Sequence, residues 1–255
     1  MNKTLSFKNI LCLLTPCLMI SAAHAQWTGY YVGANGGYAS GQSDVQTSTT
    51  FSEKGYFAPH EVPLVNQAGV GTIDLNGFTG GFQGGYNWQS DAWVYGLELD
   101  FGLLDTDATR QITKAYDPEY GGDFTINQTV QTQWLATVRP RVGFAVEDLL
   151  VYATGGLAIT QLKNQNEFSD TYGEDAHEIA NGSETQFGWT AGAGAEYLFA
   201  EDWSIKAEYL YVDFDDISTD GALITDELDD TNINTFNNTA DLQSNIVRAG
   251  INYHF

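Results

Sequence analysis

Eight segments of the chain alternate between apolar and polar side chains along most of their length. In WVYGLELDF, every second position from Trp93 to Phe101 is apolar, whereas Glu98 and Asp100 lie on the opposite face. Alternation over about ten residues is typical of β-strands whose two faces meet different surroundings. The predicted strands cover residues 29–39, 77–89, 93–104, 131–146, 149–161, 186–199, 203–212 and 243–255.

The connections between these segments fall into two classes, which alternate along the chain. Three connections are short and acidic, at 90–92, 147–148 and 200–202. The four others are long and polar, at 40–76, 105–130, 162–185 and 213–242. A water-soluble domain rarely carries four long loops without structure of their own. Short turns at one end and long loops at the other are the rule in outer-membrane β-barrels.

The apolar faces of the segments are aromatic at their ends and aliphatic in the middle, as between Phe187 and Phe199. A lipid bilayer favours this arrangement, because aromatic residues prefer its two interfaces. Unpaired backbone groups are costly in hydrocarbon, so such strands must close into a barrel. The sequence therefore predicts an all-β fold: an eight-stranded antiparallel up-and-down transmembrane β-barrel with four long external loops and three short periplasmic turns.

The first 25 residues have the pattern of a secretory signal peptide. Lys3 and Lys8 precede an apolar run, and Ala-His-Ala at 23–25 forms a small-residue cleavage site. We expect cleavage after Ala25, which leaves residues 26–255 as the barrel domain. Both cysteines of the chain, Cys12 and Cys17, lie in the removed segment. The mature chain therefore offers no disulfide and no thiolate chemistry.

Charge is distributed unevenly over the predicted elements. Residues 26–255 hold eight Lys and Arg against 33 Asp and Glu, and most of the excess acid falls in the long loops. The inward strand positions are balanced, with four acids and four bases, which we expect to pair because unpaired charges in a narrow lumen are costly. The expected pairs across neighbouring strands are Glu98 and Asp100 with Arg139 and Arg141, Glu196 with Lys206, and Glu208 with Arg248.

One residue departs from the strand pattern. Pro140 lies inside the segment 131–146. Proline has no backbone N–H to donate to a neighbouring strand, so we expect a bulge or an unpaired position there.

The segments WTGYYVGANGGY, YGLELDF, TVRPRVGFA, GWTAGAGAEYLF and NIVRAGINYHF resemble the small outer-membrane β-barrel family of alpha-proteobacteria. That family is described as porin family or opacity-type surface antigens and includes haemin-binding surface proteins. The resemblance covers all eight strands but not the long loops. It implies a location in the bacterial outer membrane, with both termini periplasmic. It also implies that the terminal Phe255, with Tyr253 and Ile251, is the signal that barrel-assembly machinery recognises.

The favoured function is that of a structural, surface-exposed envelope protein, since the interior of an eight-stranded barrel is filled by side chains. One alternative is a porin for small solutes, which requires either an oligomer or glycines such as Gly81, Gly85, Gly192 and Gly194 to leave a continuous wet path. Another is a loop-mediated receptor or adhesin. A haem ligand would need loop residues such as His60, His177, Tyr56, Tyr116, Tyr120 and Tyr172.

Catalysis, cofactors and nucleic acid are not expected. The mature chain contains three histidines, His60, His177 and His254, and no G-x-S-x-G motif. A net charge of −23 over the whole chain disfavours nucleic acid. The expected partners are outer-membrane lipid and lipopolysaccharide, the barrel-assembly machinery and, in the receptor alternative, a host or haem ligand at the loops. The acidic stretches of the loops are interpreted as solvated surface in preference to sites that hold divalent cations against lipopolysaccharide phosphates.

Overall fold

The computed structural model describes residues 26–53, 55–116, 121–171, 177–223 and 234–255. The predicted signal peptide, residues 1–25, and the loop tyrosines Tyr120 and Tyr172 lie outside these residues. The elements are β1 (Gly29–Thr49), α1 (Val62–Gly69), β2 (Val70–Ser90), β3 (Trp93–Ala115), β4 (Asp123–Val146), β5 (Leu149–Asp170), β6 (His177–Ala200), β7 (Trp203–Ala222) and β8 (Thr235–His254). None of the helical segments within the described ranges is long and apolar enough to cross a bilayer.

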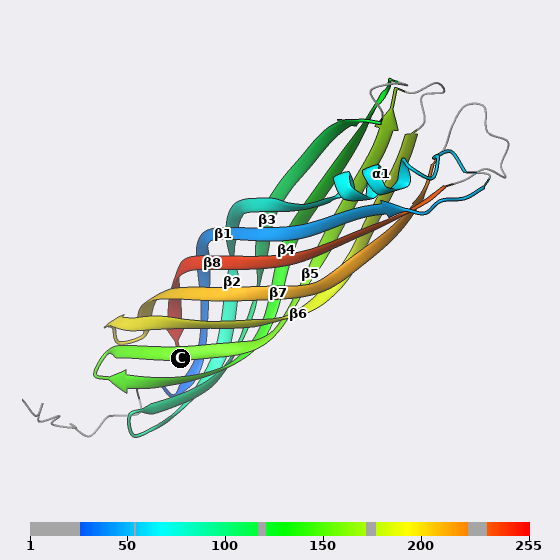
Figure 1. The fold of residues 1–255 in the computed structure, drawn as a ribbon. Coiled ribbons are helices and arrows are strands. Elements are labelled where there is room, and N and C mark those ends of the chain that lie inside the picture. Colours follow the sequence, from blue (N-terminus) through cyan, green and yellow to red (C-terminus); the bar gives the residue numbers. More distant parts are fainter. Residues whose placement is uncertain (1–25, 54, 117–120, 172–176, 224–233) are drawn as a thin grey trace, which may run out of the picture.

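The eight strands form a closed antiparallel barrel in the order β1 to β8, which confirms the predicted fold (Figure 1). Closure is made by β1 and β8, where Tyr31 lies opposite His254 and the Phe255 amide donates to the Tyr30 carbonyl at 2.9 Å. No sheet edge is therefore left open in this part of the wall.

Three tight turns join the strands at the end of the barrel that also holds Phe255, which we call the turn end. They lie at Asp91–Ala92, Glu147–Asp148 and Glu201–Asp202, as the sequence predicts. Asp91 and Glu147 adopt the left-handed region, with φ of 53° and 51°. Positive φ at the first turn position suits the twist of a two-residue hairpin.

The strands are much longer than the sequence analysis predicts. They run for 20 to 24 residues each. A transmembrane β-strand needs only about 9–11 residues. The prediction that the four long connections lack structure is wrong, because the strands continue into large parts of 40–76, 105–130, 162–185 and 213–242. We call the end to which these extensions lead the loop end.

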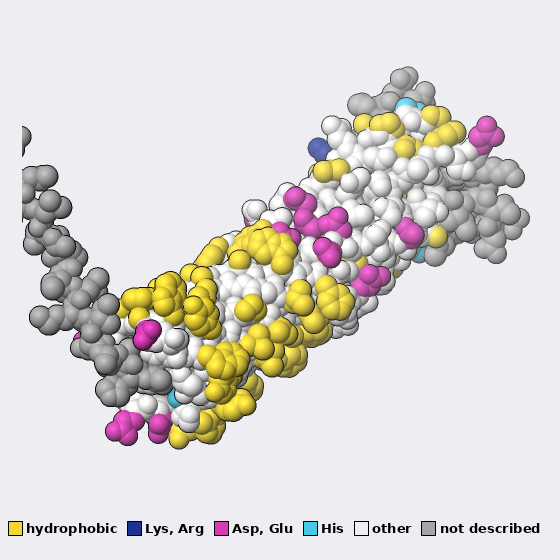
Figure 2. Space-filling model, turned by 90° about the horizontal axis from the view of Figure 1, so that it is seen from below, with side chains coloured by type: hydrophobic (Ala, Val, Ile, Leu, Met, Phe, Trp, Pro, Cys, Tyr) yellow, Lys and Arg dark blue, Asp and Glu magenta, His cyan; other side chains and the backbone are white. Residues whose placement is uncertain are grey.

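The polarity of the wall reverses between the two halves of the barrel. In the turn-end half, outward side chains such as Phe82, Leu99 and Val247 are apolar and exposed. In the loop-end half, outward positions such as Gln42 and Asp44 are polar, whereas inward Val45 is buried. Figure 2 shows the resulting apolar belt over the turn-end half, with acidic side chains just beyond it. The turn-end half is built to face lipid, and the loop-end half to face water.

The closed wall divides into two sheets in the loop-end half. Pairing between β2 and β3 ends at Gly77 and Thr106, and pairing between β6 and β7 ends at Gly188 and Phe214. All other neighbouring strands stay paired further on. One sheet then holds β3–β4–β5–β6 and the other β7–β8–β1–β2, and Figure 1 shows them diverging. We call the two gaps in pairing the β2/β3 seam and the β6/β7 seam.

An apolar interior fills the space between these two sheets. One cluster lies next to the turn-end half and includes Leu104, Val130, Leu162 and Leu242. A second, aromatic cluster lies nearer the loop end and contains Phe124, Phe168 and Phe236, together with Phe57 and residues of α1. The loop-end half therefore has the construction of a β-sandwich with its own hydrophobic core.

Pro140 takes the unpaired position that its chemistry requires. It lies opposite Leu97 of β3, but it has no partner on β5, where the register passes from Val138–Leu157 to Arg141–Thr154. The register is the same on both sides of the gap, so the strand carries no bulge there. The ladder to β5 is therefore interrupted at Arg139 and Pro140 without a shift of the side chains that follow.

Candidate functional site in the barrel lumen

Eight charged side chains meet inside the turn-end half of the barrel. They come from inward positions of β3, β4, β6, β7 and β8, and none exposes more than 4% of its side chain. The members of this charge cluster are Glu98, Asp100, Arg139, Arg141, Glu196, Lys206, Glu208 and Arg248. They are the residues that the sequence analysis assigns to the lumen.

Arg139 is the centre of the charge cluster. Its guanidinium lies 2.6 Å from Glu98, 2.8 Å from Asp100 and 3.3 Å from Glu208. Glu98 is the cross-strand neighbour of Arg139, whereas Glu208 lies on β7, across the lumen from β4. A buried guanidinium tolerates such a site because it has five donors to share among carboxylates.

Arg248 and Glu208 form the pair that their register implies. They lie opposite each other on β8 and β7, with a guanidinium nitrogen 2.6 Å from a carboxylate oxygen. Arg248 also reaches Asp100 at 3.2 Å, and the Tyr152 hydroxyl donates to Glu208 at 2.9 Å. The pair is thus part of a network rather than an isolated salt bridge.

The expected pairing of Glu196 with Lys206 is wrong. The two residues lie directly opposite each other on β6 and β7, but the Lys206 ammonium binds Glu98 at 3.0 Å across the lumen. Glu196 instead accepts from Arg141 at 3.1 Å and from Ser204 and Asn252 at 2.6 Å each. Register gives only the neighbours within the wall, whereas a narrow lumen lets long side chains reach the opposite strand.

Two inward tyrosines complete the cluster. The Arg141 guanidinium lies 4.5 Å from the ring centre of Tyr31 and 5.2 Å from that of Tyr152, which is the geometry of a cation–π contact. The Tyr31 hydroxyl donates to Glu98 at 2.8 Å. Neither tyrosine belongs to the charge pattern that predicts the lumen residues, although both occupy inward positions of their strands.

The glycines that a porin would need lie against these side chains. A Cβ atom at Gly85 would collide with the Tyr31 hydroxyl, and one at Gly194 with the Tyr152 hydroxyl. Gly81 and Gly192 lie close to the backbones of β3 and β7. These glycines make room for inward side chains and for close strand approach.

Apolar layers cover the charge cluster on both sides. On the turn-end side lie the buried residues Trp27, Val94, Leu150 and Leu198. His254 packs against the ring of Trp27, with centroids 5.7 Å apart, and its Nε2 lies 3.3 Å from Glu196. On the other side the cluster meets the core of the loop-end half. The low dielectric of these layers strengthens each ion pair and makes an unpaired charge costly.

Comparisons with known proteins place the chain. A family model described as "Outer membrane protein beta-barrel domain" matches residues 10–255. The chain belongs to the outer membrane protein β-barrel family. It is 35% identical over 237 residues to a 31 kDa outer-membrane immunogenic protein of Brucella melitensis biotype 1, which covers 90% of this chain and 84% of that protein.

A second relative is a 22 kDa outer membrane protein of Rhizobium leguminosarum bv. viciae, 33% identical over 155 residues, with 57% of this chain and 61% of that protein covered. Among solved structures, OprG of Pseudomonas aeruginosa superposes with a TM-score of 0.44 at 13% identity, covering 91% of this chain and all of that one. Like the family to which it belongs, this chain is an outer-membrane β-barrel protein.

Four of the candidate haem residues of this family member lie in the described part of the chain, and these four are not gathered into one site. His60 and His177 are exposed, in the segment before α1 and at the start of β6. Tyr56 and Tyr116 instead converge on Asp170, to which each hydroxyl donates at 2.8 Å. Burial raises the pKa of Tyr116, and the neighbouring Asp170 carboxylate adds to the rise. Within the described ranges, no group of three or more His, Cys, Asp or Glu could hold a metal ion.

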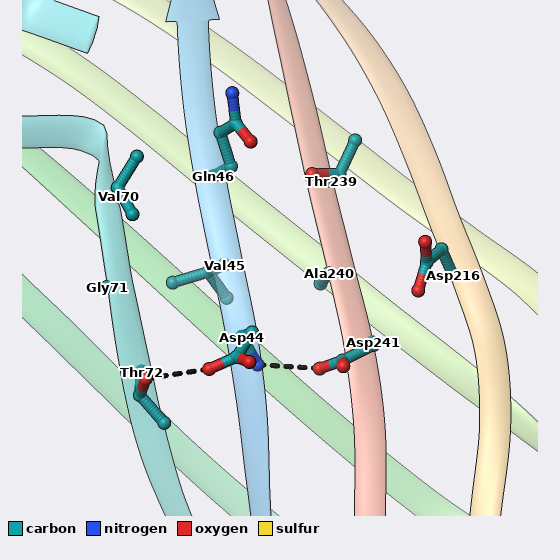
Figure 3. A pocket seen from close by; sticks show the side chains of 10 residues that line it. All are labelled: Asp44, Val45, Gln46, Val70, Gly71, Thr72, Asp216, Thr239, Ala240 and Asp241. Atoms are coloured by element: carbon teal, nitrogen blue, oxygen red, sulfur yellow. Dashed lines mark hydrogen bonds between the residues drawn. The ribbon is translucent and has the colours of Figure 1, made fainter. Parts of the chain in front are cut away.

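A pocket of about 380 Å³ opens in the outer wall beyond the apolar belt, between β1, β2, β7 and β8 (Figure 3). It carries three aspartates, Asp44, Asp216 and Asp241. The Asp44 amide donates to Asp241 at 2.6 Å, and the Thr72 hydroxyl donates to Asp44 at 2.7 Å. Burial raises the pKa of Asp241, and the Asp44 carboxylate adds to the rise. A wall of this charge repels an anionic ligand such as haem.

The last residues of the chain lie on the lipid side of the barrel. Phe255 exposes 73% of its surface at the turn end, and Ile251 lies further along the same outward face. Tyr253 stacks edge-to-face on Phe255 and on Trp203, with ring centres 5.0 and 5.1 Å apart. These contacts join the end of β8 to the girdle of aromatic residues at the turn-end interface.

Proposed function

We propose that this outer-membrane protein is a closed barrel that displays the loop-end half at the cell surface and passes no solutes. The single observation that carries the proposal is the charge cluster, whose eight side chains are nearly free of solvent and covered on both sides by apolar layers. A water-filled path would leave these groups hydrated and exposed.

The proposed orientation places both termini and the three short turns in the periplasm. The polar outer wall of the loop-end half then projects outward from the cell. Short turns on the periplasmic side are the rule in barrels of this class. The immunogenic character named for the Brucella relative fits a protein whose β-structured half stands above the lipid.

The proposed partners follow from the surface. The apolar belt takes lipid and the acyl chains of lipopolysaccharide, and the exposed end of β8 at Phe255 is the site for the barrel-assembly machinery. No catalytic role is proposed, because the buried acids and bases of the lumen form ion pairs with one another.

Planar-bilayer recording on refolded protein tests the closed lumen. We expect no stable conductance steps from preparations that show the heat-dependent electrophoretic shift of a folded barrel. A large porin inserted in the same bilayer serves as the positive control. Stable steps from the folded protein would replace the closed lumen with a porin.

Cysteine labelling tests the orientation, since residues 26–255 contain no cysteine. A membrane-impermeant maleimide added to intact cells should label Gln165→Cys, whose side chain is exposed on β5. Asn166→Cys is the matched control, because the next residue points inward and is buried. Asp148→Cys at the turn end should stay unlabelled until the cells are lysed. Labelling of Asp148→Cys on intact cells would show the opposite orientation.

A further inference from the structure

The loop-end half contains a buried carboxyl group that has no cationic partner among the described residues. Glu178 lies at the start of β6, nine residues before Phe187 begins the apolar belt, and its side chain is fully buried. Its Oε1 atom accepts one long hydrogen bond from Asn238 Nδ2 at 3.4 Å. Its Oε2 atom has no hydrogen-bond partner in the described part of the chain. An ionised carboxylate with this surrounding would be strongly disfavoured.

Asn238 has the complementary defect. This residue of β8 is also fully buried, and its Oδ1 atom has no partner within the described residues either. Two groups that already share one hydrogen bond therefore each keep one unsatisfied acceptor oxygen. A proton on Oε2 would turn that atom into a donor, and the carboxylic acid and the amide could then close a ring of two hydrogen bonds.

The described residues around Glu178 supply no cation to stabilise the ionised form. On β5, Phe168 lies opposite Glu178, and the nearby buried acid Asp170 is itself bound by the hydroxyls of Tyr56 and Tyr116. On β7 the nearest residue is Gly221, where a Cβ atom would collide with the Glu178 carboxyl. Three titratable side chains beside these residues are exposed: Glu167 on β5, His177 on β6 and Asp220 on β7. From β1, Thr47 and Thr49 line the interior without charge.

The position of this pair in the wall gives it mechanical importance. Glu178 lies along the β6/β7 seam, where β6 has lost its hydrogen-bonded partner strand. The Glu178–Asn238 contact joins β6 in one sheet to β8 in the other. At the β2/β3 seam the corresponding bridge does not depend on pH, because a guanidinium stays protonated. There Arg110 donates to the carbonyls of Ala68 and Val70 at 3.2 and 3.1 Å.

We propose that Glu178 carries a proton in the closed loop-end half and pairs with Asn238 as an acid–amide ring, so that proton loss releases the β6/β7 seam. When the proton leaves to water, Oε2 and Asn238 Oδ1 face each other as two acceptors, and the ionised carboxylate is drawn toward solvent. The seam is the route by which it reaches water, because no backbone ladder closes the wall there. The projecting half is then a pH-sensitive element.

Burial raises the pKa of Glu178 from its usual range to about 7. The unfolded or opened form ionises near 4.5, so the closed form binds the extra proton between these two values. Stability of the closed form is therefore greatest below about pH 4.5 and falls as pH rises toward 7, with no further loss above it. One pH unit within this window changes the open population about tenfold.

Hydrogen exchange on the refolded full-length protein tests the proposal. Amide exchange in 177–187 and 215–222, corrected for the intrinsic pH dependence, should increase about tenfold per pH unit between pH 5 and 7 and then level off. Glu178→Gln preserves the shape and supplies a permanent donor, so its exchange in these segments should be independent of pH and close to the wild-type rate at pH 5.

The matched control is Glu167→Gln, which removes an outward carboxylate from the adjacent strand. It should leave the wild-type pH profile unchanged. Asn238→Leu removes the amide, and we expect about tenfold faster exchange of the seam amides at pH 5.

Infrared spectroscopy gives a readout that does not depend on opening. The wild type at pH 6 should show the carbonyl band of a protonated carboxylic acid, and this band should be absent from Glu178→Gln. Two results would overturn the proposal: a band unchanged by Glu178→Gln, or seam exchange in the wild type that has no pH dependence beyond that of Glu178→Gln. A third is protection at pH 8 that requires added Na⁺ or Ca²⁺, which would place a cation rather than a proton between the two oxygens.

Discussion

The Arg248–Glu208 pair offers the sharpest test of the lumen network. Arg248 lies 2.6 Å from Glu208 and 3.2 Å from Asp100, and both partners are buried. Arg248→Met would leave four buried acids facing three bases, and Glu208→Leu would leave four bases facing three acids. Breaking one side of a buried ion pair typically costs about 3–5 kcal/mol.

The double variant restores the balance of charge. With Arg248→Met and Glu208→Leu together, Asp100 keeps Arg139 at 2.8 Å, and the remaining three acids face three bases. Replacing a whole buried pair by apolar residues of similar size is often close to neutral. We therefore expect the double variant to cost only about 1–2 kcal/mol, against about 6–10 kcal/mol for the two single changes added together.

The assay is a double-mutant cycle in urea unfolding from lipid vesicles, followed by tryptophan fluorescence. The expected coupling free energy is at least about 4 kcal/mol. A control cycle between Arg248→Met and Glu167→Leu, whose carboxylate lies outward on another strand, should be additive within about 0.5 kcal/mol. Additivity of Arg248→Met and Glu208→Leu within that same margin would show that the two charges do not depend on each other.

Three further outcomes follow from the wall of the barrel. Heating in detergent should shift the electrophoretic mobility, because a closed barrel resists unfolding until boiled; identical migration before and after boiling would contradict closure. Deleting Phe255 should reduce the amount in the outer membrane far more than Phe255→Tyr, which keeps an aromatic ring at the interface, and normal levels of the deletion would remove its proposed role in assembly. Ile251→Arg on the lipid face should lower the free energy of unfolding from vesicles by about 2–4 kcal/mol. Thr235→Arg, exposed on the same strand beyond the belt, should change it by less than about 0.5 kcal/mol, and equal effects of the two changes would show that the bilayer does not lie at the apolar belt.

The turn-end half could be derived from the sequence, because lipid imposes a simple rule on it. Every outward position must be apolar, so Trp93 and Leu99 mark one face of a strand and Glu98 the other. The loop-end half escapes that rule. In the segment around Val45, the outward residues Gln42 and Asp44 are polar, and Val45 is the one aliphatic residue among the inward positions. Neither face of this segment therefore has the row of apolar residues by which a lipid-facing strand is found. Strands facing water there are visible only when the alternation is followed with its polarity reversed.

The lumen shows a similar division. Parity along each strand is enough to place the charged residues inside, because lipid excludes them from the other face. Register then supplies partners such as Glu98 and Arg139, which lie opposite each other. It fails for Lys206, since the ammonium of a long side chain binds Glu98 across the lumen rather than the adjacent Glu196. Distances across a narrow barrel are not encoded in the spacing of residues along any one strand.

The reversal of wall polarity also fixes the depth of the protein in the membrane. Sinking by two residues along each strand would bring Asp105, the outward residue that follows Leu103 on β3, into hydrocarbon, while rising would expose Phe255 and the aromatic residues beside it to water. A bilayer of different thickness must therefore adapt to the protein, not the protein to the bilayer. With about ten residues of each strand beyond the belt, at about 3.3 Å per residue and a tilt of about 40°, the loop end stands roughly 25 Å above the lipid. The barrel thus holds the residues of the loop end at a fixed distance from the membrane surface.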